Sequence, residues 1–225
     1  MNSADPIVYV VDDDLFVRGA LSSLIRSVGL RTATFASTRD FLQYTRPDVP
    51  SCLVLDVLLP DASGLDLADR LRTSDVQIPI IFITGHGTIP MSVRAMKGGA
   101  VEFLTKPIRD EDLISALRQA LERDQLAIAQ RAELTRLRER LETLTSRERD
   151  VFALVVTGRL NKQIAEELGA AEQTIKVHRG RVMRKLGIRS VAELVRLAER
   201  VTGQPWAPAV SATKAQGDPP AVPGG

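Results

Sequence analysis

The chain has 225 residues, 44% of them hydrophobic and 26% charged, so it is long enough for two ordinary globular domains. Its single cysteine excludes an intramolecular disulfide, so a reducing compartment is expected. Neither an apolar run of about 18 residues nor a basic and apolar leader is present, so we expect a cytoplasmic location with no membrane contact. The net charge of +2 hides an asymmetry, because residues 1–125 carry 13 Lys and Arg against 17 Asp and Glu, whereas residues 126–225 carry 17 against 11. The basic second half indicates a polyanionic partner.

The first half alternates short apolar runs with amphipathic stretches. The expected strands are Ile7–Val11, Thr32–Phe35, Cys52–Asp56, Ile80–Thr84 and Glu102–Thr105. The expected helices are Leu15–Ser27, Thr38–Thr45, Leu65–Arg72, Met91–Lys97 and a long one from Asp110. Apolar strands that alternate with helices predict a parallel sheet buried on both faces. Five strands in about 120 residues fit a doubly wound, flavodoxin-like α/β fold, whose ligands lie at the carboxyl ends of the strands.

Polar residues follow several of these strands at the edge where a ligand is expected. Asp12 and Asp13 come directly after the first strand and Asp56 ends the third, so the sheet brings three carboxylates into one small space. Mg²⁺ neutralises such a cluster and keeps waters that a phosphate can replace. Thr84 and Lys106 stand at two further strand ends, and a hydroxyl and an ammonium are suited to phosphoryl oxygens.

The third carboxylate of the opening triplet, Asp14, has a different explanation. It stands immediately before the helix that begins at Leu15, where its side chain can accept hydrogen bonds from the first helical amides. Taken alone, the triplet also fits a loop of solvated helix caps. Asp56, Thr84 and Lys106 at the other strand ends favour a metal site over a loop of helix caps.

The long helix carries a leucine repeat near its end. No Gly or Pro interrupts the chain between Asp110 and Leu144, and Leu134, Leu137, Leu141 and Leu144 step by three, four and three residues. This spacing is typical of an a/d seam. Two interpretations remain open, a solvated connecting helix and a short coiled coil that pairs two protomers, and the leucine spacing favours pairing.

The remainder of the folded sequence is helical from Thr145 to Arg200. LTSRERDVFALVVTG begins with Thr145 or Ser146 as a helix cap and has an acidic first turn, NKQIAEELG stops at a glycine, and QTIKVHRGRVMRKLG stops at another. Two short helices joined by a turn with glycine, the second strongly cationic, predict a helix-turn-helix unit.

A helical wheel divides the cationic helix into faces. The residues expected to pack inward are Ile175, His178, Val182 and Leu186. Those expected to enter the major groove are Lys176, Val177, Gly180 and Arg184. Those expected beside them, near phosphates, are Arg179, Arg181 and Lys185. An exposed valine among cations suits a thymine methyl group, although the cationic face alone also fits an ordinary solvated surface.

These motifs resemble two known domains. VVDDD, LVLDVLLPDASGLDL and IIFITGHGTIPMSVRAMKGGAVEFLTKP together resemble the receiver domain of bacterial response regulators, in its FixJ-type branch, over residues 5–123. LTSRERDVFALV, NKQIAEELG and TIKVHRGRVMRKLGIRS resemble the LuxR-type DNA-binding domain over residues 141–201. Residues 124–140 are then expected to form a helical linker, and the Pro-, Ala- and Gly-rich residues 202–225 a disordered tail.

The resemblance implies a role for each residue of the acidic site. Asp56 is expected to accept a phosphoryl group from a sensor histidine kinase, and Lys106 to contact the phosphoryl oxygens. The expected Mg²⁺ ligands are Asp12, Asp13, Asp56 and the carbonyl of Leu58. The resemblance also implies a cis peptide between Lys106 and Pro107, and a switch in which the Thr84 hydroxyl moves to the phosphate while the Phe103 ring turns inward.

The resulting hypothesis is a transcription regulator controlled by phosphorylation, not an enzyme, with double-stranded promoter DNA and RNA polymerase as partners and a homodimer as its phosphorylated form. Phosphorylation could act by dimerising the receiver or by freeing a masked helix-turn-helix. A Mg²⁺-dependent phosphohydrolase with an aspartyl nucleophile would need a second acid where Leu58 stands. A dinucleotide-binding module would need a G-x-G-x-x-G motif after the first strand, and none follows.

Overall fold

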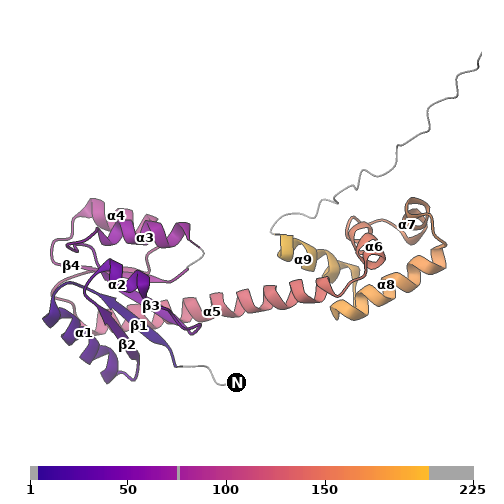
Figure 1. Ribbon diagram of the computed structural model, residues 1–225. Helices are drawn as coiled ribbons and strands as arrows, with labels where there is room; N and C mark the ends of the chain where they lie inside the picture. The colour runs from indigo at the N-terminus through magenta and orange to yellow at the C-terminus, as the bar shows by residue number, and fades with distance from the viewer. Residues whose placement is uncertain (1–4, 75–76, 203–225) are drawn as a thin grey trace, which may run out of the picture. The chain divides into compact units, whose positions relative to one another are not determined.

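The computed structural model describes residues 5–74 and 77–202, and the chain divides after Arg131 into two compact units (Figure 1). The first unit is a sheet with helices on both faces, and the second is helical. The tail that the sequence predicts to be disordered lies, from residue 203 onward, outside the described residues. Within the described ranges, no helix combines the length and apolar character that a membrane crossing requires.

The sheet of the first unit is parallel throughout, with the order β2-β1-β3-β4-β5. Its strands are β1 Ile7–Val11, β2 Arg31–Phe35, β3 Ser51–Asp56, β4 Ile80–Thr84 and β5 Glu102–Thr105. The predicted doubly wound topology is confirmed, and the predicted strands deviate only at the first residue of β2 and of β3. The order of the strands reverses between β1 and β3, which is where such sheets bind ligands.

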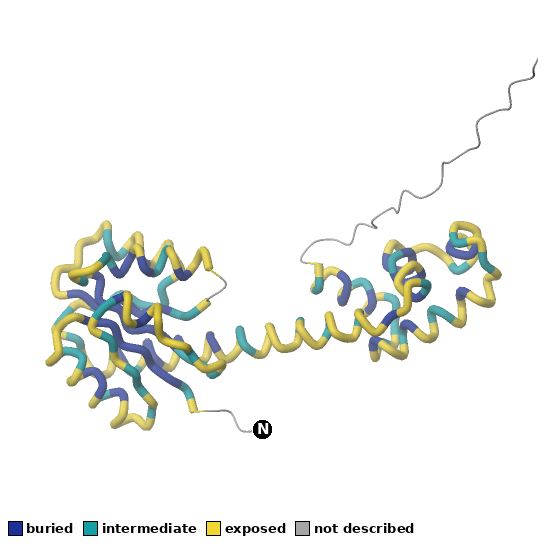
Figure 2. The backbone as a smooth tube through the Cα atoms, in the orientation of Figure 1, coloured by how far each residue is buried: buried dark blue, intermediate teal, exposed yellow. Residues whose placement is uncertain are grey.

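Helices cover both faces of this sheet, so its central strands are buried at almost every position (Figure 2). The helices are α1 Leu15–Ser27, α2 Thr38–Gln43, α3 Gly64–Thr73, α4 Ile89–Lys97 and the long α5 Asp110–Glu142. On one face, Leu21 and Ile25 of α1 and Leu113 and Leu117 of α5 pack against Val8 and Val10. On the other face, α2, α3 and α4 pack against the alternate residues of the strands.

The second unit contains α6 Ser146–Val156, α7 Asn161–Leu168, α8 Glu172–Leu186 and α9 Val191–Thr202. Val151, Phe152, Ile164, Ile175 and Leu194 lie in its core. The predicted capping box is present at the start of α6, where the Thr145 hydroxyl accepts from the Glu148 amide and the Glu148 carboxylate accepts from the Thr145 amide.

Glycines end both helices of the predicted helix-turn-helix. Gly169 follows α7 with a φ of 59°, and Gly187 follows α8 with a φ of 68°. Both angles lie in the left-handed region that favours glycine at a helix C-terminus. The predicted ends of α7 and α8 are therefore confirmed.

Three leucines of the repeat pack within the second unit. Leu137 and Leu141 pack against its core, and Leu144, which lies beyond the end of α5, is only 2% exposed in that core. Pairing of two protomers through the repeat stays a prediction.

Candidate functional site

The three predicted carboxylates do converge at the carboxyl end of the sheet. One oxygen from each of Asp12, Asp13 and Asp56 lies within 4.8 Å of the others. Asp12 is fully buried and Asp56 is 5% exposed, whereas Asp13 faces solvent. Carboxylate oxygens around a partly open space are the ligands that Mg²⁺ prefers, so this donor set fits the ion.

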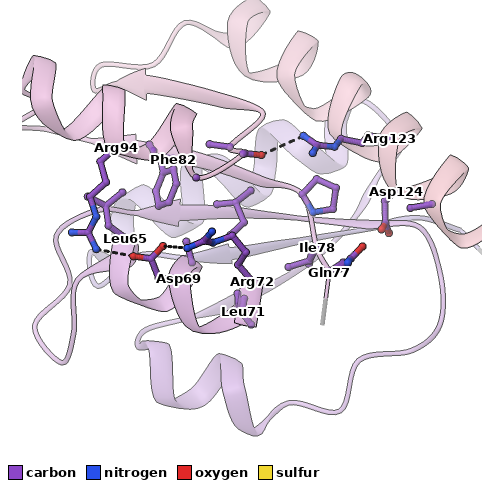
Figure 3. A pocket seen from close by; sticks show the side chains of 18 residues that line it. Leu65, Asp69, Leu71, Arg72, Gln77, Ile78, Phe82, Arg94, Arg123 and Asp124 are labelled. Carbon is purple, nitrogen blue, oxygen red and sulfur yellow. Dashed lines mark hydrogen bonds and ion pairs between the residues drawn. The ribbon is translucent and has the colours of Figure 1, made fainter. Parts of the chain in front are cut away.

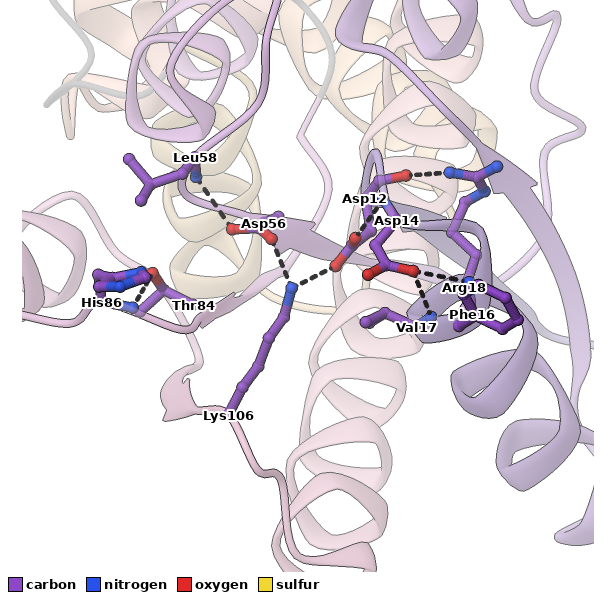
Figure 4. A network of polar contacts seen from close by, with 10 residues as sticks. All are labelled: Asp12, Asp14, Phe16, Val17, Arg18, Asp56, Leu58, Thr84, His86 and Lys106. Atoms are coloured by element: carbon purple, nitrogen blue, oxygen red, sulfur yellow. Dashed lines mark hydrogen bonds and ion pairs between the residues drawn. The ribbon is translucent and has the colours of Figure 1, made fainter.

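Lys106 joins the two buried carboxylates (Figure 4). Its Nζ atom donates to Oδ2 of Asp12 at 2.7 Å and to Oδ2 of Asp56 at 2.6 Å. Burial alone would lower the pKa of this ammonium, but the hydrogen bonds to the two carboxylates raise it above its ordinary value. Burial raises the pKa of Asp12, against the opposing effect of Lys106 and the Asp14 amide. The predicted cis peptide between Lys106 and Pro107 is present.

Asp14 caps α1 as predicted (Figure 4). Its carboxylate accepts from the amides of Phe16 at 2.7 Å and Val17 at 3.2 Å. Arg18, one turn further along α1, donates to the backbone carbonyl of Asp12 at 2.6 Å. That contact escaped sequence analysis, because an arginine on an amphipathic helix usually faces solvent.

The loop that follows Asp56 holds the second oxygen of the Asp56 carboxylate. The Leu58 amide donates to Oδ1 of Asp56 at 2.9 Å, and the Gly64 amide donates to the Val57 carbonyl at 2.9 Å. A methyl group at Gly64 would stand 2.1 Å from the Asp56 carbonyl oxygen, so only glycine fits at this first residue of α3. The loop thus holds the Asp56 side chain through Leu58 and the Val57 backbone through Gly64.

The expected switch residues lie on β4, the strand beside that of Asp56, and on β5, the next strand along. Thr84 ends β4 and is buried, and its hydroxyl accepts from the His86 amide at 3.2 Å. Phe103 of β5 is half-buried, with its ring centroid 6.4 Å from that of Phe82. Gly87 lies against both, because a methyl group there would come within 3.1 Å of the Phe103 ring and 3.2 Å of the Thr84 methyl.

A cavity of about 340 Å³ lies in the first unit between α3, α4 and α5 (Figure 3). Arg94 of α4 reaches α3 beside it and donates to Asp66 at 2.9 Å and Asp69 at 2.8 Å. Phe82 lines the cavity and connects it to the Phe103 ring. The sequence contains no signal for these ion pairs, because their partners are 28 and 25 residues apart along the chain. Each is exposed, so each contributes little to stability.

The predicted faces of α8 agree with the burial of its side chains. Ile175, Val182 and Leu186 are buried, and His178 is half-buried on the same side. The positions expected to enter the groove are exposed, and Val177 presents 44% of its surface to solvent. At Gly180 an added methyl group would meet open space. Hence an apolar contact flanked by cations is available to a partner.

Two of the cations expected near phosphates also hydrogen-bond within the protein. Lys185 donates to the carboxylate of Glu148 at 2.6 Å and to the Thr143 carbonyl at 2.9 Å. Arg179 donates to the Asn161 side chain at 2.9 Å and so connects α8 to the start of α7. Arg181 and Arg184 are exposed. A helical wheel shows which way a side chain of α8 faces, but it does not show which part of the chain lies beside that side chain.

Comparison with known families matches both halves of the chain. Residues 8–118 match the family described as "Response regulator receiver domain", and residues 142–198 match "Bacterial regulatory proteins, luxR family". The carboxylate cluster lies in the first match and α8 in the second.

Similar proteins share this arrangement over most of their length. Nodulation protein W of Bradyrhizobium diazoefficiens is 53% identical over 197 residues, which cover 88% of this chain and 87% of that protein. The transcriptional regulatory protein FixJ of Rhizobium meliloti is 41% identical over 195 residues, or 86% of this chain and 95% of that protein.

Solved structures lead to the same family. The response regulator StyR matches with a TM-score of 0.76 at 47% identity, covering 88% of this chain and 100% of that one. Full-length FixJ from B. japonicum matches with a TM-score of 0.51 at 35% identity, covering 88% and 97%. The chain therefore belongs to the FixJ-like response regulators, transcription regulators of two-component systems that join a receiver domain to a LuxR-type DNA-binding domain.

Proposed function

We propose that Asp56 accepts a phosphoryl group from the phosphohistidine of a sensor kinase. A carboxylate oxygen of Asp56 forms the new P–O bond while the P–N bond of the phosphohistidine breaks, and the electron pair stays with the histidine nitrogen. One observation carries this assignment. Both oxygens of this almost buried carboxylate are oriented, Oδ1 by the Leu58 amide and Oδ2 by Lys106.

The neighbouring groups then serve the transferred phosphoryl group. Asp12 and Asp13, with Asp56 and the Leu58 carbonyl, would hold Mg²⁺, which neutralises charge on the phosphoryl oxygens when it is bound. Lys106 already lies between the two buried carboxylates, and it would transfer one of its hydrogen bonds to a phosphoryl oxygen.

The switch of the family would operate at the adjacent strands. Among the described residues, the Thr84 hydroxyl accepts a bond of 3.2 Å from the His86 amide and donates none, so it is available to donate to a phosphoryl oxygen. Its movement would leave space for the half-buried Phe103 ring to turn further inward. Gly87 lies against both residues and must move with them.

The DNA-binding unit would read promoter DNA with α8. Lys176, Val177, Gly180 and Arg184 are proposed to face the major groove, with Arg181 and Arg179 beside it. We assign residues 5–123 to the receiver, 124–140 to the linker and 141–201 to the DNA-binding domain. Phosphorylation would favour a homodimer on a paired DNA site, where RNA polymerase is the further partner. A DNA partner and one cysteine suit a cytoplasmic protein.

The assignment is tested by labelling with a small phosphodonor such as acetyl phosphate in the presence of Mg²⁺. Asp56→Asn is expected to abolish labelling and to keep the melting temperature near that of the wild type. Asp13→Asn is expected to weaken Mg²⁺ binding, whereas Asp14→Asn, which keeps an oxygen for the α1 cap, is expected to leave it unchanged. Labelling that persists at another aspartate in the Asp56→Asn variant would disprove the assignment.

A further inference from the structure

Asp61, in the loop after Asp56, is hydrogen-bonded to the start of α2. Oδ2 of Asp61 accepts from the hydroxyl of Thr38 at 2.7 Å and from the amide of Arg39 at 3.3 Å. Thr38 is the first residue of α2 and is only 6% exposed. The carboxylate therefore satisfies a buried hydroxyl and one of the free amides at the start of α2.

This contact holds the tip of a loop whose base is already fixed. At the base, the Gly64 amide donates to the Val57 carbonyl at 2.9 Å, and Leu58 and Ser63 form a bridge. Between those ends, Leu59 packs against the core and Asp61 bonds to α2. The orientation of Leu58, whose amide bonds to the acceptor carboxylate, depends on how this loop is held.

The α2 side of this contact is connected to Asp12 through β2. The Asp12 amide donates to the Phe35 carbonyl at 3.3 Å, and α2 begins three residues after Phe35. The bond between Asp61 and Thr38 therefore closes a ring. One side of that ring carries Asp12, and the other carries Asp56 and Leu58.

We propose that Asp61 and Thr38 are positioning residues for the metal site, which set the spacing between the loop of Asp12 and Asp13 and the loop of Asp56 and Leu58. This inference rests on the proposed function, because it assumes that these loops hold Mg²⁺. Neither residue touches the ion. Their bond reduces the number of loop conformations in which the ligand oxygens are misplaced, as outer contacts of metal sites do.

The test measures metal affinity in the full chain, with Mn²⁺ alone as the probe and free Mn²⁺ counted by electron paramagnetic resonance. Asp61→Ala and Thr38→Val, which keeps the branched shape, are each expected to weaken binding roughly tenfold, the low end of the loss caused by outer-shell changes. The double variant is expected to bind no more weakly than Asp61→Ala, because both changes break one contact. Asp61→Asn keeps an acceptor oxygen and is expected to bind within about twofold of the wild type.

Ser37→Ala is the matched control. The Ser37 hydroxyl accepts from the Asp40 amide at 3.1 Å, so this variant also removes a cap from α2 but leaves the Asp61 contact intact. It is expected to lower the melting temperature as Asp61→Ala does and to bind Mn²⁺ like the wild type. Equal weakening in Ser37→Ala, wild-type affinity in Asp61→Ala and Thr38→Val, or weakening in Asp61→Asn as large as in Asp61→Ala would each overturn the proposal. A wild-type protein that binds no Mn²⁺ would instead reject the metal site itself, and the inference with it.

Discussion

Lys185 of α8 and Glu148 of α6 form an ion pair of 2.6 Å that fastens the recognition helix to the helix before the helix-turn-helix. The Glu148 carboxylate is almost buried and also accepts from the Thr145 amide at 2.9 Å, within the capping box. The same ammonium donates to the Thr143 carbonyl. A cation that the sequence assigns to a DNA phosphate thus completes a network inside the domain.

We expect Lys185→Ala to lower the free energy of unfolding and to leave the number of contacts with DNA phosphates unchanged. It leaves the Glu148 carboxylate without its charged donor, which should cost about 1–3 kcal/mol of unfolding free energy. Urea unfolding measures this loss, and binding to DNA over a salt series measures the contacts. The slope of affinity against salt should stay at the wild-type value for Lys185→Ala, whereas Arg181→Ala should reduce it by about one ion. A reduced slope for Lys185→Ala would show that Lys185 contacts a DNA phosphate.

Stability should depend on pH through Glu148. The hydrogen bond from Lys185, with that from the Thr145 amide, lowers the pKa of Glu148 from 4.5 to about 2. A carboxyl group with a lowered pKa in the folded state stabilises the fold above its unfolded pKa, and that contribution is lost as the pH falls from 4.5 towards 2. Urea unfolding of the wild type and Glu148→Gln across this range should show a difference that shrinks on acidification. A constant difference would contradict the assigned role.

Much of the receiver follows from local sequence patterns, because a strand buried on both faces is apolar at every position and its polar end residue stands out. Asp12, Asp56, Thr84 and Lys106 can be identified in that way. What could not be predicted depends on partners that are distant in sequence. Asp61 and Thr38 are 23 residues apart, and only the fold brings them together.

The linker and the recognition helix show the same limit. A repeat such as that of Leu137, Leu141 and Leu144 indicates an apolar stripe, but periodicity does not say whether its partner is a second protomer or the same chain. Within this chain, the three leucines pack against the core of the second unit. The helical wheel of α8 predicted the buried residues Ile175, Val182 and Leu186 correctly. It could not predict the hydrogen bond of Lys185 to Glu148, which is 37 residues away in the sequence.

Gly64 offers a steric test of the proposed acceptor site at Asp56. Gly64→Ala places a methyl group 2.1 Å from the Asp56 carbonyl oxygen, so the β3 end or the start of α3 must shift. We expect a loss of unfolding free energy of about 1–3 kcal/mol, the usual cost of overpacking, and slower labelling by acetyl phosphate. Gly19→Ala in α1 is the control, because a methyl group there meets nothing within 4 Å. That variant should be more stable by about 0.5–1 kcal/mol. Equal behaviour of the two variants would reject the steric argument.

Recognition of specific DNA should depend on the exposed face of α8. Lys176→Ala and Val177→Ala are each expected to cost about 1–3 kcal/mol on the cognate site and much less on random DNA. Arg181→Ala should weaken cognate and random DNA about equally, because a phosphate contact carries no sequence information. Titrations of both DNAs at several salt concentrations separate the two effects. Equal losses on both DNAs for Val177→Ala would contradict a contact with a base.

His178 provides the check on how α8 is rotated, since it stands next to Val177 in the sequence but faces the other way. Its ring is half-buried, and its Nδ1 atom is buried with no hydrogen-bond partner in the part of the chain that the structure describes. His178→Ala removes packed ring atoms, so we expect a lower melting temperature and a loss of about 1–3 kcal/mol of unfolding free energy. Cognate and random DNA should be affected alike, at a temperature where the variant is folded. Should His178→Ala melt like the wild type and lose only cognate binding, α8 must turn when it meets DNA and bring this ring to the bases.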